Sequence, residues 1–69
     1  MSDRIVSDIN IFGGEPRIKG TRIPARIILI HLAAGDRVEE LLRDFPSITE
    51  EDIRAYLEYA SYLATEHVA

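Results

Sequence analysis

Apolar side chains dominate residues 27–32, where the sequence reads Ile-Ile-Leu-Ile-His-Leu. Pro24 suits the first position of a helix and Gly35 suits the position just after its end, so we expect a helix over residues 24–34. A helix that is apolar on nearly every side is buried on more than one side. In so small a domain, one of those sides is predicted to meet a second copy of the chain. The predicted dimer interface consists of Ile27, Leu29 and Ile30.

The next apolar pattern predicts a second helix over residues 37–44. Its apolar positions follow the spacing i, i+3, i+4 and i+7, and they are Val38, Leu41, Leu42 and Phe45. Asp36 is predicted to cap the first turn, with Glu39 three residues on in a capping-box relation. Pro46 is predicted to end the helix.

A third helix is expected to start after Thr49. Thr49 and Asp52 have the spacing of a capping box, and Ile48 and Ile53 have the spacing of a hydrophobic staple. The predicted core stripe consists of Ile53, Tyr56, Leu57, Ala60 and Ala64.

Three further residues of this helix fall outside the core stripe: Tyr59, Tyr62 and Leu63. Tyrosine combines an apolar ring with a polar hydroxyl, which suits the wet edge of a protein interface. We predict that these three side chains bind a protein partner. The alternative is that they pack beneath the N-terminal segment.

The N-terminal residues combine short apolar runs with glycine and proline. Residues 5–6 and 9–12 are expected to be short extended pieces. Residues 17–18 and 22–23 flank Lys19-Gly20-Thr21, which predicts a small hairpin or bend. The chain is therefore predicted to be one mainly α domain spanning residues 1–69. Residues 1–23 form a short β ribbon with a basic turn, and residues 24–69 form a small trihelical, helix-turn-helix-like body.

The composition narrows the class of protein. A chain of 69 residues without cysteine holds one small core and no disulfide. No apolar run approaches the roughly 20 residues of a membrane-spanning helix, and the first residues lack a leader pattern. We therefore expect a cytoplasmic protein that does not act at a membrane.

Charge is unevenly distributed along the chain. The net charge is −4, yet residues 1–26 hold five basic and three acidic side chains, whereas the remainder holds three basic and nine acidic ones. If the second and third helices acted as a helix-turn-helix, the residues facing DNA would include Glu50 and Glu51, which repel phosphate. The predicted nucleic-acid contacts lie on the ribbon instead: Arg17, Lys19, Arg22 and Arg26. For Arg22, a structural role on backbone carbonyls is an equal alternative.

Signatures of catalysis or cofactor binding are lacking in the sequence. Gly13-Gly14 is not followed by the spacing of a nucleotide-binding loop, and neither His31 nor His67 has a histidine partner four residues away. The serines have no local histidine and carboxylate arrangement. We expect no enzyme, no cofactor, no metal and no small-molecule substrate.

The string Gly14-x-Pro16-x-Ile18-x-Gly20-Thr21-Arg22-Ile23-Pro24 resembles the signature of the domain-of-unknown-function 433 family. The resemblance extends over roughly residues 5–63. Its further matches are Gly35, Phe45-Pro46-x-Ile48-Thr49, Asp52-Ile53 and Tyr59-Ala60.

The resemblance to this family implies a small VapB-like antitoxin with a helix-turn-helix-like fold. Such a protein binds a nuclease-like toxin and, as a regulator, its own promoter DNA. The alternative is a homodimeric protein-interaction module that does not bind DNA.

Overall fold

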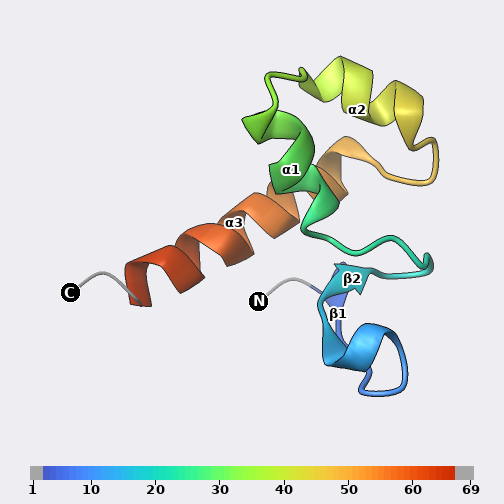
Figure 1. The fold of residues 1–69 in the computed structure, drawn as a ribbon, viewed down its shortest axis with the longest axis vertical. Coiled ribbons are helices and arrows are strands. Elements are labelled where there is room, and N and C mark those ends of the chain that lie inside the picture. Colours follow the sequence, from blue (N-terminus) through green and yellow to red (C-terminus); the bar gives the residue numbers. More distant parts are fainter. Residues whose placement is uncertain (1–2, 67–69) are drawn as a thin grey trace.

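A short antiparallel ribbon leads into three helices in the computed structural model of the chain, which describes residues 3–66 (Figure 1). The elements in order are β1 (Ile5–Val6), a 3-10 turn η1 (Phe12–Gly14), β2 (Arg17–Ile18), α1 (Ile27–Ala33), α2 (Val38–Asp44) and α3 (Glu50–Glu66). The predicted fold class, a mainly α trihelical domain with an N-terminal β ribbon, is confirmed.

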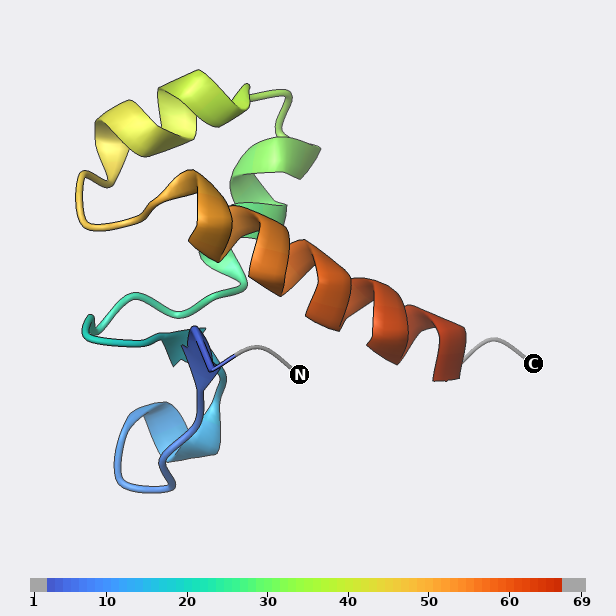
Figure 2. The same cartoon turned by 180° about the vertical axis from the view of Figure 1, so that it is seen from behind.

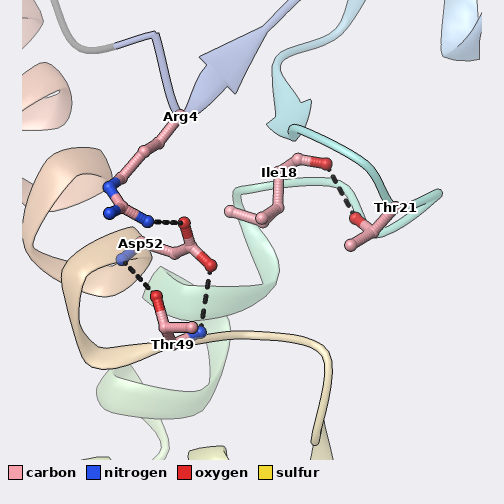
Figure 3. A network of polar contacts seen from close by, with 5 residues as sticks. All are labelled: Arg4, Ile18, Thr21, Thr49 and Asp52. Atoms are coloured by element: carbon pink, nitrogen blue, oxygen red, sulfur yellow. Dashed lines mark hydrogen bonds and ion pairs between the residues drawn. The ribbon is translucent and has the colours of Figure 1, made fainter.

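The ribbon pairs β1 with β2 so that Ile5 lies opposite Ile18. Both isoleucines are buried, because alternate strand residues face the same side and that side meets the helices. The predicted hairpin after β2 is present: the Ile18 amide donates to the Ile23 carbonyl at 3.1 Å, and the Thr21 hydroxyl donates to the Ile18 carbonyl at 2.8 Å (Figure 3). The predicted extended piece over residues 9–12 is wrong. A bridge between Asp8 and Ile11 closes a turn there, and η1 follows.

α1 begins three residues later than predicted. Pro24 still belongs to the ribbon, because it bridges to Arg17 and the next amide, that of Ala25, donates to the Pro16 carbonyl at 2.9 Å. The predicted end at Gly35 is correct. Gly35 has a φ of 96°, a value that glycine adopts readily and other residues avoid. The amides after the helix fold back onto its last carbonyls, which closes it in a Schellman arrangement.

The cap of α2 lies one residue later than predicted. Arg37 is the extended residue before the helix, and its amide donates to the Glu40 carboxylate at 2.9 Å. Asp36 and Glu39 therefore do not form the capping box. The Asp36 amide donates to the His31 carbonyl in the Schellman turn, and the Asp36 carboxylate lies 2.7 Å from His31 Nδ1.

α3 begins with the capping box that the sequence predicts. The Asp52 amide donates to the Thr49 hydroxyl at 3.2 Å, and the Thr49 amide donates to the Asp52 carboxylate at 3.0 Å. The other oxygen of the same carboxylate accepts a bond from Arg4, 3.2 Å away, just before β1 (Figure 3). One buried acid thus joins the start of α3 to the ribbon.

The core lies where the ribbon and the three helices meet. Its buried apolar residues are Ile5, Ile18, Ala25, Ile28, Leu41, Ile48, Ile53, Ala55 and Tyr56. The predicted stripe of α3 is correct for Ile53 and Tyr56 and wrong for Leu57 and Ala64, which are exposed. The buried face is rotated toward Asp52 and Ala55 because Arg4 and β1 pack on that side of the helix.

We expect Asp52→Ala to destabilise the fold by about 1–2 kcal/mol. The loss combines one helix cap, worth about 1 kcal/mol, with an ion pair weakened by the partial exposure of Arg4. Thermal unfolding would report a fall of about 4–8 °C per kcal/mol. Glu51→Ala, which removes the exposed neighbouring acid, is the control; equal losses in both variants would contradict the role assigned to Asp52.

Candidate functional site

The last turns of α3 extend past the other helices, with no helix beside them (Figures 1 and 2). Leu63 lies two helical turns after Tyr56 on the same face. Yet Tyr56 is 7% exposed and Leu63 is 38% exposed, because within residues 3–66 the packing that buries Tyr56 does not extend as far as Leu63. Tyr62, beside it, is 61% exposed. The apolar face of α3 therefore continues beyond the core as an uncovered surface.

The third residue of the predicted partner site lies differently. Tyr59 is half-buried and packs against the core, with its ring 6.1 Å from that of Tyr56. The structure thus brings Tyr62 and Leu63 to the surface and turns Tyr59 inward. We call the exposed pair, Tyr62 and Leu63, the α3 end.

α1 also presents an apolar outer face. Ile28 is fully buried, whereas Leu29 and Ile30 point away from the core and are exposed, and Ile27 is half-buried between the two sides. Two of the three predicted dimer residues are therefore uncovered in the single chain.

The four predicted nucleic-acid residues separate into two pairs. Arg17 donates to the Thr21 carbonyl at 3.3 Å, and Arg26 forms an ion pair with Glu15. Lys19 and Arg22 are exposed, and no ion pair to either is found within residues 3–66. The arginine that braces the hairpin is thus Arg17, and the outward basic charge of the ribbon comes from Lys19 and Arg22.

The start of α3 is unsuited to leading a DNA contact. Glu50 and Glu51 are exposed there, and Glu50 pairs with Arg54 at 3.2 Å. Asp52 faces inward and is held by Thr49 and Arg4. Exposed carboxylates at this position repel phosphate, and the basic side chains described beside them, Arg54 and Arg4, are bonded to Glu50 and Asp52.

The fold shifts the pKa of the Tyr56 hydroxyl. Burial raises the pKa of the Tyr56 hydroxyl above its ordinary value of 10.0, the neighbouring Tyr59 hydroxyl and the Glu15 carboxylate raise it further, and Arg26 acts in the opposite direction. The hydroxyl therefore lies where α3, the ribbon and the turn before α1 come together. Its environment keeps it protonated.

The histidines lie in different situations. His31 sits beside Asp36, and its ring packs in a T-shaped arrangement with the Phe45 ring, with ring centres 5.2 Å apart. His67 lies outside the described residues. Within residues 3–66, no group of three or more potential ligands is placed to hold a metal ion. None of the helices in that part of the chain has the length and apolar character needed to cross a bilayer.

Two surface features escaped the sequence analysis. The first is an apolar loop tip, where Ile9 and Phe12 are exposed and Phe12 has a φ of 53°, unusual for a bulky residue. The second is a groove between α2 and α3, which we call the α2–α3 groove. It is lined by Val38, Glu39, Glu50, Ile53, Arg54 and Leu57. The helical pattern assigned Leu57 to the core. Its partial exposure in the structure is what indicates the groove.

Comparison with known proteins gives a family match. The sequence profile of the family described as "Protein of unknown function (DUF433)" matches residues 5–60. A similar protein is the "Uncharacterized protein y4eO" of Sinorhizobium fredii (strain NBRC 101917 / NGR234), which is 39% identical over 56 residues. Those residues are 81% of this chain and 25% of the relative, so the chain spans about a quarter of the length of that relative. No solved structure matches the chain significantly. The family match includes the ribbon and the α2–α3 groove and stops before Tyr62.

The shifted hydroxyl predicts a pH dependence of stability. Above pH 10, Tyr56 loses its proton in the unfolded chain and keeps it in the folded chain, so the unfolded state binds fewer protons. The contribution of Tyr56 to the free energy of unfolding should therefore be constant below pH 10 and fall as the pH rises toward the folded pKa. Denaturant titrations from pH 8 to 12 measure this slope. Tyr56→Phe should reduce it, whereas Tyr62→Phe, at an exposed tyrosine, should not; an unchanged slope in Tyr56→Phe would refute the assignment.

Proposed function

This chain belongs to the family described as "Protein of unknown function (DUF433)", and on that premise we propose that it is an antitoxin-like regulatory protein that binds a nuclease-like protein partner. The observation that carries the proposal is the uncovered α3 end. Tyr62 and Leu63 extend a core face beyond the core, and large apolar side chains left in this position mark interaction sites.

The energetics of the α3 end favour a protein as its partner. Full burial of a leucine-sized side chain contributes about 1.5–3 kcal/mol. Tyrosine is among the residue types that dominate interface energies, because its ring is rigid and its hydroxyl stays satisfied at a wet rim. A single helical turn carrying both residues is therefore an efficient anchor on a folded partner.

The charge of the body favours a partner that handles nucleic acid. Residues 27–69 hold nine acidic and three basic side chains. A nuclease carries basic side chains along the path of its substrate's phosphates. An acidic helical body complements such a surface electrostatically, which speeds association and selects against other partners.

Binding to promoter DNA is the regulatory half of the proposal. Lys19 and Arg22 supply two outward charges per chain, and two copies supply four. Such a small number gives weak, strongly salt-dependent affinity, so DNA is a secondary ligand. The alternative, a homodimeric interaction module that does not bind DNA, is favoured by the exposed carboxylates at the start of α3.

We expect the double variant Tyr62→Ala and Leu63→Ala to weaken binding to the nuclease-like product of an adjacent reading frame by tenfold or more, measured by calorimetry. Ser61→Ala changes an exposed residue of the same turns, leaves the Thr65 bond to the Ser61 carbonyl in place, and is the control. Unchanged affinity in the double variant would place the partner elsewhere on the chain.

Charge reversal at Lys19 and Arg22 is the companion measurement. It should abolish any mobility shift of upstream promoter DNA at low salt while sparing the protein partner. The absence of a shift for the unchanged protein, even with its partner present, would reject DNA regulation and leave the interaction module.

The uncovered outer face of α1 supports a homodimer. Leu29 and Ile30 should lie at its centre, and Leu29→Glu or Ile30→Glu should convert the dimer to a monomer in light scattering at micromolar concentration. Since both side chains are exposed in the single chain, the monomer should keep its helical circular dichroism. A monomeric unchanged protein would refute this interface.

A further inference from the structure

The α2–α3 groove is a hollow of about 360 Å³ between the first turn of α2 and the first half of α3. The two helices point in different directions from the turn that joins them (Figure 2). Val38, Ile53 and Leu57 give it an apolar lining. Ile53 is buried, whereas Leu57 is 37% exposed and accessible to another molecule.

The two acids that line the groove are paired within the chain, Glu39 with Arg37 at 3.9 Å and Glu50 with Arg54 at 3.2 Å, so the acidic charge that could attract a partner lies on the surface next to the groove. Arg54 is the only basic side chain among the described residues that line the groove. A second hollow of about 170 Å³ adjoins the groove and shares Arg54 with it; Glu51 and Glu58 line this hollow. Arg4, which also lines it, is bonded to Asp52. The guanidinium charges are thus balanced, and no ion pair to Glu51 or Glu58 is found within residues 3–66.

Glu51 and Glu58 are seven residues apart, so they lie on one face of α3 about 10.5 Å from each other along the helix axis. Basic side chains seven residues apart on a second helix have the same separation. An amphipathic helix with this charge spacing would place its apolar stripe beside Val38 and Leu57. This is the usual way in which a helix is held in an apolar groove with a charged rim.

We propose that the α2–α3 groove binds a lysine- or arginine-rich amphipathic helix of a protein partner. One large apolar side chain of that helix lies between Val38 and Leu57, and its basic side chains face Glu51 and Glu58. Nucleic acid is excluded from this surface by the same carboxylates. This inference rests on the proposed function in that both require a protein partner. It concerns a different surface, because the groove is separate from the α3 end.

The test uses the whole chain, isotopically labelled, and a synthetic 18-residue peptide of leucine and lysine in helical register. The backbone amide resonances of Val38, Ile53 and Leu57 should shift on titration, and added salt should weaken the binding. Two control peptides distinguish the contribution of basic charge to binding from that of the helical apolar stripe. One replaces every lysine with glutamate, and the other keeps the composition but breaks the helical register of the leucines; neither should bind.

Two matched pairs of variants locate the site. Leu57→Ser should weaken peptide binding about fivefold or more, whereas Leu29→Ser, at a leucine that is 40% exposed on α1, should not. Glu58→Lys should weaken binding about three- to tenfold, whereas Asp44→Lys makes the same charge change at the end of α2 and should have little effect.

The proposal is overturned if the peptide does not bind at millimolar concentration, if either control peptide binds equally, or if the shifts fall outside the groove. The double variant of the α3 end should leave peptide binding unchanged. Failure of the groove is therefore distinguishable from failure of the proposed function, which is measured at Tyr62 and Leu63 with the nuclease-like partner.

Discussion

The carboxylate of Asp52 is the interaction on which the arrangement of the domain depends. One of its oxygens holds the Thr49 amide at the start of α3, and the other holds Arg4 next to β1. A buried charge is unfavourable unless it is paired and hydrogen-bonded, so this acid fixes the ribbon and α3 relative to each other. Because that side of α3 packs against the ribbon, Leu57 lies on the outer side of the helix. The groove beside α2 follows from the same orientation.

The order of the elements was predictable because local signals agreed with the fold. The spacing of Thr49 and Asp52 predicted the start of α3, and Gly35 predicted the end of α1. The cap of α2 was not predictable in the same way, because Asp36–Glu39 and Arg37–Glu40 both have the spacing of a capping box. The Schellman turn at Gly35 decides between them, since it directs the Asp36 amide back to the His31 carbonyl.

The candidate surfaces were predictable only in part, because they depend on contacts between distant segments. From the sequence, Tyr59 and Tyr62 are equivalent candidates for a partner site. In the structure Tyr59 is half-buried and Tyr62 is exposed, because the core ends between them. A structural role on backbone carbonyls was the predicted alternative for Arg22, yet in the structure the Thr21 carbonyl of the hairpin accepts a bond from Arg17. Neither the ion pair of Arg26 with Glu15 nor the groove beside Leu57 has a local signature.

The last turns of α3 extend past the other helices. This end of the folded domain is therefore subject to a helix–coil equilibrium. Among the described residues, these last turns are held by their own backbone hydrogen bonds and by a side-chain bond from the Thr65 hydroxyl to the Ser61 carbonyl at 2.9 Å. Short helical segments without tertiary contacts are marginal in water. The turns carrying Tyr62 and Leu63 are therefore expected to open more readily than those around Ile53 and to exchange their amide hydrogens faster. Any molecule that covers this end also raises its helicity, so affinity there includes a term for local folding.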